Sequence, residues 1–310
     1  MLAGTLENLF INGDFLPGLW RTEEVECAVG RHTFAAARWK VRYARPEGAP
    51  ITQARSADGS LELRGAPGVT QPVLLGQRIE AAEAVRYRGE LVFSAWVQAT
   101  GSEAAHGDLG LVCESAGEAD DFGAVKTEFH TCLEAVPTGR WVQIERAIDA
   151  RAFQPTGLSV ELEFPARLLH RADSRIRVKG MRLAHASAAQ RTVARPASME
   201  DQLARRFYQR HDSSTVNAIG RALVVNAHEL HFQFTFPEMR AFPACTLPHP
   251  EDGFRVFSLE GIPQEGFTYD VPYRSRGSAI IRATKAQHGL ADGYLPFVAS
   301  SAALLLDAEL

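Results

Sequence analysis

The sequence lacks the signatures of several large classes of protein. Its four cysteines form no C-x-x-C pair, so neither a zinc knuckle nor a dithiol redox motif is expected. No apolar run approaches the roughly 20 residues that a membrane-spanning helix needs. The first ten residues hold no basic segment followed by a long apolar one, so no secretory signal is predicted. We therefore expect free, buried thiols in a soluble protein that is made in the cytoplasm.

Positive charge is also scarce. The 33 lysines and arginines are outnumbered by 37 aspartates and glutamates, which gives a formal net charge of -4. General nucleic-acid binding usually needs a basic face, so no nucleic-acid partner is expected. Hydrophobic residues make up 45% of the 310 positions, which is enough for two domains with ordinary cores.

No motif for catalysis is present. The sequence has no Gly-rich phosphate loop, and no Ser-His-Asp order appears in a supporting motif. Glu128, Glu161 and Glu163 are the acids that a glycosidase pair would use, but alternating glutamates along a strand are typical of a solvated outer face. We therefore predict no enzymatic activity and no catalytic residue.

The segment His228-Glu229-Leu230-His231 is similar to a zinc motif but lacks its spacing. A zincin needs the second histidine one residue later and on a helix. This segment alternates like a strand, which places His228 and His231 on opposite faces. No metal site is predicted here.

Short alternating segments fill the first two thirds of the sequence. In the clearest one, Leu91, Phe93, Ala95 and Val97 share one face, and Val92, Ser94, Trp96 and Gln98 share the other. Further strands are predicted near residues 39–43, 60–64, 73–79, 142–148, 158–164 and 175–183. Many short strands with Gly, Pro and Asp between them, and no long helix, predict an all-β fold of the β-sandwich or jelly-roll type.

The best helix candidate is the segment 198–211, which separates two sets of strands. Ser198 caps its first turn, and Leu203, Phe207 and Tyr208 lie along one apolar face. We expect these three side chains to be buried between domains or between subunits. The predicted organisation is a jelly roll over residues 1–190, a linker helix over 191–215 and a C-terminal β-sandwich assembly domain over 216–310.

Several motifs occur in a defined order along the chain. They are N-L-F-I-N-G-D-F from Asn8, A-A-R-W-K-V, G-Q-R-I-E, L-V-F-S-A-W-V-Q-A, G-R-W-V-Q-I-E and L-A-R-R-F-Y-Q-R, which ends at Arg210. The ordered set resembles the carbohydrate-binding-module type of jelly roll in phage and prophage tail-fibre proteins. Later, F-T-F-P-E-M-R-A-F-P from Phe234 resembles a strand-turn-strand of C-terminal domains in related virion proteins.

This resemblance implies a non-enzymatic fibre or head-spike component of a phage, prophage or gene transfer agent particle. Such a protein is made in the bacterial cytoplasm and located in the virion. Its partners are other virion proteins and the host cell-surface polysaccharide that it binds for attachment, and it assembles as a homotrimer. Many related jelly rolls carry a structural calcium beside a closing I-D strand. Here that strand has Ile176-Arg177-Val178-Lys179, with basic residues where the acidic ligand would stand, so no cofactor is assigned.

Sugar binding by a jelly roll needs an exposed aromatic ring with polar neighbours. Trp96 is the first candidate because Ser94 and Gln98 share its face; Trp39 and Tyr87 are further candidates. Two alternatives remain open. One is a purely structural virion adaptor or collar protein, which predicts that every tryptophan is buried. The other is a polysaccharide depolymerase or esterase, which predicts paired carboxylates or a Ser-His pair in a cleft.

Overall fold

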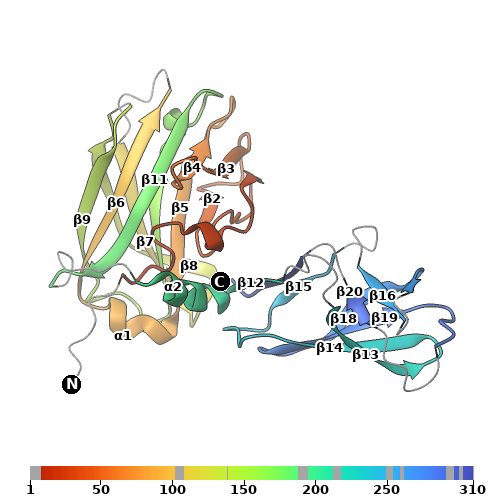
Figure 1. Cartoon of the computed structure of the whole chain (residues 1–310). Coiled ribbons are helices and arrows are strands. Elements are labelled where there is room, and N and C mark those ends of the chain that lie inside the picture. Colours follow the sequence, from red (N-terminus) through yellow and green to blue (C-terminus); the bar gives the residue numbers. More distant parts are fainter. Residues whose placement is uncertain are drawn as a thin grey trace. The chain divides into compact units, whose positions relative to one another are not determined.

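The computed structural model describes residues 8–101, 108–137, 139–187, 195–211, 218–248, 254–258, 262–290, 297–299 and 303–309. The chain divides into two compact units, the first ending at Ala204 and the second spanning Arg205–Glu309 (Figure 1). All strand pairs among these residues are antiparallel. The predicted fold class, a jelly-roll β-sandwich followed by a smaller β domain, is confirmed.

Two sheets form the sandwich of the first unit. The six-stranded sheet has the order β1 (Glu24–Cys27), β3 (Ile51–Arg55), β4 (Leu61–Arg64), β11 (Arg175–His185), β6 (Glu90–Thr100) and β9 (Val142–Asp149). The five-stranded sheet has the order β2 (Lys40–Tyr43), β5 (Val73–Ile79), β10 (Leu158–Phe164), β7 (Asp108–Glu118) and β8 (Asp121–Ala135). The described part of this unit also contains the short helices η1 (Pro17–Leu19), η2 (Ala81–Glu83), α1 (Ala84–Tyr87) and η3 (Ala166–Leu168).

The alternation read from the sequence decides which side chains fill the space between the sheets. All four predicted inward residues of β6 are fully buried: Leu91, Phe93, Ala95 and Val97. Their counterparts on β10 (Leu158, Val160, Leu162 and Phe164) are equally buried, so the two sheets share one core. Burial of each such side chain stabilises the fold by roughly 1.5–3 kcal/mol.

The N-terminal motif N-L-F-I-N-G-D-F forms no strand. Residues 8–15 are irregular, because Asn12 takes a left-handed conformation with φ 58°. The motif still runs beside β11: the Leu9 amide donates to the Leu183 carbonyl at 2.7 Å, and the Met181 amide donates to the Gly13 carbonyl at 2.9 Å. A Cβ on Gly13 would lie 2.2 Å from the Met181 carbonyl oxygen, so this approach requires glycine.

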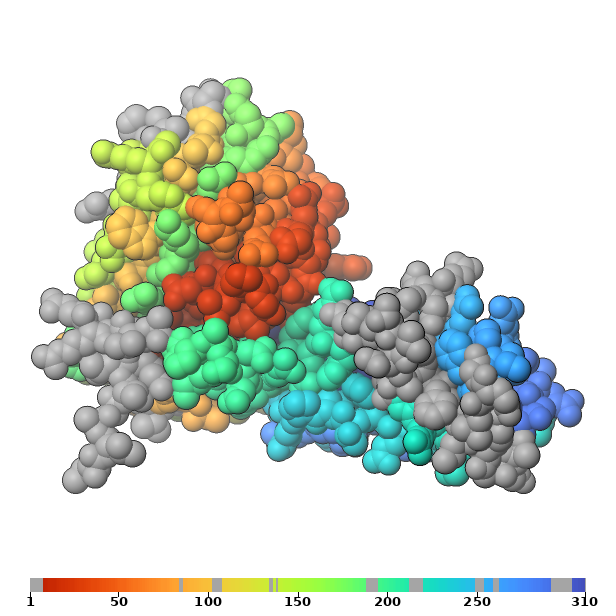
Figure 2. Space-filling model, in the orientation of Figure 1, coloured from red at the N-terminus to blue at the C-terminus, as the bar shows by residue number. Residues whose placement is uncertain are grey.

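Helix α2 (Ala197–Arg205) is bonded to this N-terminal motif. The buried carboxylate of Glu200 accepts a hydrogen bond from the Asn12 amide at 2.5 Å and pairs with Arg195 at 3.0 Å. The Arg195 guanidinium also donates to the Phe10 carbonyl at 2.9 Å. Figure 2 shows the N-terminal segment (red) beside α2 (green) on the surface of the first unit. The N-terminal motif and helix α2 are nearly 190 residues apart in the sequence, and these hydrogen bonds hold them together in the fold.

The predicted linker helix over 191–215 is wrong for residues 206–211, and residues 191–194 and 212–215 of the prediction lie outside the described part of the chain. The helix ends at Arg205, and residues Tyr208–His211 form strand β12 instead. The change follows from pairing, because each residue of β12 has a partner on β21 (Leu304–Asp307). Phe207 is buried, whereas Leu203 and Tyr208 are half-buried. Their burial between domains or subunits stays a prediction.

The second unit contains two further sheets. One has three strands in the order β12, β21 and β15 (Ala244–Thr246). The other has seven, in the order β17 (Pro263–Gln264), β16 (Arg255–Phe257), β20 (Phe297–Ala299), β13 (Ala218–Asn226), β14 (Glu229–Thr235), β19 (Ser278–Thr284) and β18 (Thr268–Arg274). The apolar residues that alternate along β14 and just after it are buried: Leu230, Phe232, Phe234 and Phe236.

The four cysteines are free thiols, and Cys27 and Cys113 are buried as expected. Cys132 is exposed, so burial was wrong for this residue, which lies on β8 at the edge of its sheet. In the described part of the chain, no helix is both long and apolar enough to cross a membrane.

Candidate functional site

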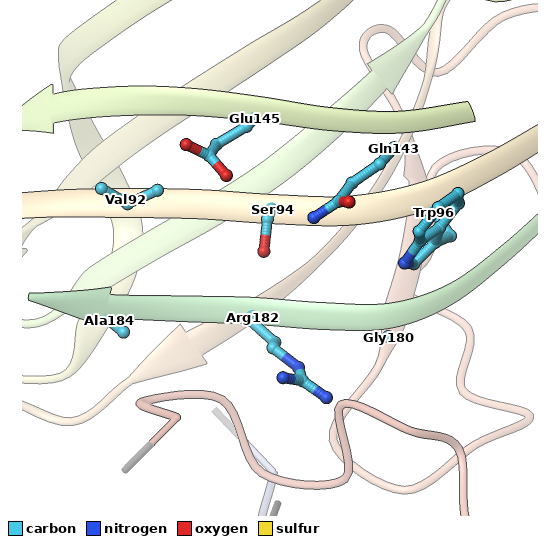
Figure 3. Close-up of a pocket in the computed structure, with 8 residues that line it drawn as sticks. All are labelled: Val92, Ser94, Trp96, Gln143, Glu145, Gly180, Arg182 and Ala184. Carbon is cyan, nitrogen blue, oxygen red and sulfur yellow. The ribbon is translucent and has the colours of Figure 1, made fainter. Parts of the chain in front are cut away.

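The outer face of the six-stranded sheet is hollowed around Trp96. The pocket has a volume of about 190 Å³ and crosses three neighbouring strands, β9, β6 and β11 (Figure 3). Its lining residues are Val92, Ser94 and Trp96 from β6, Gln143 and Glu145 from β9, and Gly180, Arg182 and Ala184 from β11. The volume is below the roughly 300–1,000 Å³ of sites for drug-sized ligands, so it suits one sugar ring.

The pairing register arranges the polar side chains in two rows across the strands. In one row, Ser94 stands between Glu145 and Arg182. In the other row, Trp96 stands between Gln143 and Lys179. Neighbouring strands are about 4.8 Å apart, so each row brings hydrogen-bonding groups within reach of a single ligand.

A bulge in β11 opens the space beside the indole ring. The register shifts between Lys179 and Arg182, and Gly180 within the bulge has φ 58°. A Cβ on Gly180 would lie 3.4 Å from Cδ1 of Trp96, so a larger residue here would press against the ring. The extra residue also places both Lys179 and Arg182 on the outer face, although residues three apart on a regular strand face opposite sides.

Trp96 is 40% exposed on β6, the strand next to the edge strand β9. Its ring offers an apolar surface, and the neighbouring side chains of the two rows supply an amide, a hydroxyl, a carboxylate and cations. This combination suits a sugar, whose ring has an apolar C–H face and a polar rim of hydroxyl groups.

Two of the predicted sugar-binding residues are wrong. Trp39 is fully buried in the core, where its indole N–H donates to the Asn12 carbonyl at 2.7 Å and its ring packs against Phe10. Tyr87 is also fully buried, and its hydroxyl donates to the Gln154 carbonyl at 3.2 Å. Neither ring has a face for a ligand. The sequence marks both as aromatic but does not say which aromatic residues face the core.

The remaining predicted residues separate into lining and flanking positions. Ser94 and Trp96 line the pocket, whereas Gln98 lies on the same strand face beyond it and donates to the Gly139 carbonyl at 3.1 Å. Sequence reasoning missed Gln143, Glu145 and Arg182. Alternation places each of them on an outer face, but only the order of strands in the sheet brings β9 and β11 beside β6.

A second polar cluster lies on the five-stranded sheet. The buried carboxylate of Glu161 pairs with the Lys40 ammonium at 2.6 Å and accepts from Arg42 Nε at 2.9 Å. Arg42 also reaches Glu114 at 3.0 Å. Gly76 lies on β5 between Lys40 and Glu161, and its missing side chain leaves room for their contact across the strand. The expected solvated face of alternating glutamates is therefore wrong at Glu161.

The charges around Glu161 keep it ionised. Burial on its own raises the pKa of a carboxyl, but the Lys40 ammonium and the Arg42 guanidinium outweigh it and lower the pKa of Glu161 to about 2. A carboxylate held in this way does not donate a proton near neutral pH, which is the property that a general acid needs. The geometry indicates a buried ion cluster that orders the sheet.

The described residues contain no group of three or more His, Cys, Asp and Glu side chains placed to hold a metal ion. In the segment that is similar to a zinc motif, His231 Nε2 lies 2.5 Å from Glu229 Oε1. Glu229 and His231 are two residues apart on strand β14, which is the strand that we predicted there.

Comparisons with known proteins return structures but no sequence relatives. No protein-family model matches the chain, and no curated protein matches it. The arabinose-bound α-L-arabinofuranosidase MgGH51 is similar over 59% of this chain at 13% identity, with a TM-score of 0.37. That match spans only 27% of the arabinofuranosidase.

Two carbohydrate-binding modules match over nearly their whole length. TmCBM61, solved in complex with β-1,4-galactotriose, matches 58% of this chain and 99% of its own, with 13% identity and a TM-score of 0.32. The CBM22-2 xylan-binding domain of Paenibacillus barcinonensis Xyn10C matches 57% of this chain and 99% of its own, with 14% identity and a TM-score of 0.35. No residue role is transferred at these identities, so the site rests on its own geometry.

Proposed function

We propose that the protein binds polysaccharide through the pocket around Trp96 and that it does so without catalysis. The observation that carries this proposal is the exposed indole with polar side chains around it on one sheet face. The exposure of Trp96 is also the feature that distinguishes a receptor-binding role from a purely structural one, which predicts buried tryptophans only.

We further propose that the protein is a fibre or spike component of a phage-like particle and attaches it to host cell-surface polysaccharide. The ordered motifs of the sequence support this role. The hydrogen bond from the Asn12 amide to Glu200 joins the first of those motifs to helix α2, the helix in which the last motif, L-A-R-R-F-Y-Q-R, begins. A single shallow site binds weakly, so attachment would depend on several copies of the protein acting together.

A structural adaptor remains the second candidate, and one observation favours it. The second unit exposes large apolar side chains, among them Leu223 at 58% and Phe242 at 67%. Such residues are typical of surfaces that other chains cover. The same surface serves the first proposal if the second unit assembles with copies of itself, as the predicted trimer requires.

The test compares the full-length protein with its Trp96→Ala variant on immobilised polysaccharides from bacterial surfaces. We expect the wild type to bind at least one of them and the variant to bind at least tenfold more weakly, a loss of about 1.4 kcal/mol, because the indole supplies the apolar surface on which a sugar ring packs. Phe34→Ala is a matched control that removes another aromatic ring of the first unit outside the pocket. Equal binding by wild type and Trp96→Ala would reject the site.

A further inference from the structure

We infer that the pocket around Trp96 selects a sugar residue that carries a carboxylate, such as a uronic acid, and orients the acidic group towards strand β11. This inference rests on the proposed polysaccharide binding and adds the class of ligand. It follows from the charges on the outer face of the six-stranded sheet, where cations lie along β11 although the whole chain is net negative.

Four outward positions of β11 carry positive charge. They are Arg175, Arg177, Lys179 and Arg182, and they lie opposite Thr100, Gln98, Trp96 and Ser94 of β6. The chain as a whole has a net charge of -4. The same face also carries carboxylates, among them Glu62 on β4, Glu90 on β6 and Glu145 on β9, so its positive charge is concentrated on β11.

Two of these cations are held away from the pocket. Arg177 pairs with Glu62 at 2.8 Å, on the side of β11 away from Trp96. Arg175 donates to the carbonyl of Ala172 at 2.6 Å and to that of Ser174 at 2.8 Å. Both therefore stabilise the fold around the end of the strand.

The other two cations lie opposite Trp96 and Ser94. Arg182 lines the pocket, and Lys179 lies directly opposite Trp96 in the register. The Lys179 ammonium lies 4.1 Å from the centre of the Trp141 ring. This cation–π contact holds the ammonium in place. Lys179 thus places positive charge next to the apolar stacking surface, and the Arg182 guanidinium lies on the side of β11 away from β6.

The opposite side of the pocket has the reverse character. β9 contributes the Glu145 carboxylate and the Gln143 amide, which accept and donate hydrogen bonds to hydroxyl groups. Figure 3 shows the Arg182 guanidinium on the side of β11 away from β9, and Glu145 on β9. A sugar ring on Trp96 would therefore place its carboxylate over β11 and its hydroxyls over β9, because the reverse orientation brings two carboxylates together.

The test uses acidic polysaccharides and the same polymers after chemical reduction of their carboxyl groups to alcohols. The probes are polygalacturonate, alginate and acidic capsule extracts, each compared with its reduced form on full-length protein at low and at physiological salt. We expect the acidic form to bind at least fivefold more tightly, with a difference that shrinks as salt screens the charges.

Two variants assign this preference to the cations. Lys179→Gln and Arg182→Gln should each reduce binding of the acidic form about fivefold and leave binding of the reduced form unchanged. Lys126→Gln, which removes an exposed cation from the other sheet, is the matched control. Trp96→Ala should weaken binding of both forms.

The outcomes separate this inference from the proposed function. Equal binding of the acidic and reduced forms, or binding of neutral polymers alone, overturns the acidic preference and leaves polysaccharide binding intact. A preference for the acidic form that both Gln variants retain also overturns the inference, since the cations of β11 would not cause it. Absence of binding to every acidic and neutral polymer overturns both.

Discussion

At the scale of single residues, Gly76 decides whether the buried ion cluster forms. A Cβ at this position would lie 2.5 Å from Cγ of Glu161 and 2.4 Å from the Val160 carbonyl oxygen. Gly76→Ala should therefore lower the free energy of unfolding by roughly 1–3 kcal/mol, as overpacking in a core does. Urea unfolding measures the loss. Gly18→Ala is the control, because a Cβ on Gly18 meets no atom within 4 Å. Equal midpoints for the two variants would contradict the packing argument.

Glu161 gives stability a dependence on pH. Its pKa is lowered from 4.5 to about 2 in the folded protein, so its contribution is complete above pH 4.5 and is lost as pH falls towards 2. Glu161→Gln leaves the buried Lys40 ammonium without its carboxylate and should cost roughly 3–5 kcal/mol near neutral pH. The gap in unfolding free energy between wild type and variant should narrow between pH 5 and pH 2. A gap that stays constant over this range would show that Glu161 is not the titrating group.

At the scale of elements, helix α2 acts as a support for the N-terminal motif. Replacing Glu200 by Gln removes the charge that pairs with Arg195 and weakens the acceptor for the Asn12 amide, at a cost of roughly 1–3 kcal/mol. Hydrogen exchange should become faster in residues 8–16 and in α2 together. Glu47→Gln, an exposed acid of the same unit, should leave exchange unchanged. Faster exchange in only one of the two segments would show that helix α2 does not support the N-terminal motif.

The end of α2 shows how pairing overrides local preference. Residues 198–211 have one apolar face along their whole length, yet the helix stops at Arg205. The last residues gain backbone hydrogen bonds with β21, which comes almost 100 residues later in the chain. Helix periodicity describes a segment in isolation, whereas a strand exists only where a partner lies beside it.

At the scale of the whole molecule, the proposed attachment depends on assembly through the second unit. Leu223 and Val225 are both exposed on β13, on the face turned away from the core. The double variant Leu223→Ser and Val225→Ser should reduce the mass in solution measured by analytical ultracentrifugation. Binding to immobilised polysaccharide should then weaken by about 10²–10⁴ through loss of multivalency, while binding of a short oligosaccharide stays the same.

Val125→Ser provides the control for this experiment. Val125 is an apolar residue of the first unit with similar exposure, 45%, so its replacement removes the same kind of surface elsewhere. A double variant that keeps the mass of the wild type would reject β13 as the assembly surface. An unchanged mass together with weaker binding to the oligosaccharide would show that the substitutions damage the sugar-binding site and not the assembly.

The sequence by itself determined the fold class, the bounds of β5 and β10, and the two faces of β6, because alternation in a strand has a period of two that burial must follow. It also placed Ser94 and Trp96 on one outer face. Only the tertiary structure decided that Trp39 and Tyr87 lie in the core and that Gln143, Glu145 and Arg182 complete the pocket. The order of strands in a sheet, and the bulge at Gly180, arise from contacts between distant segments, and no local pattern contains them.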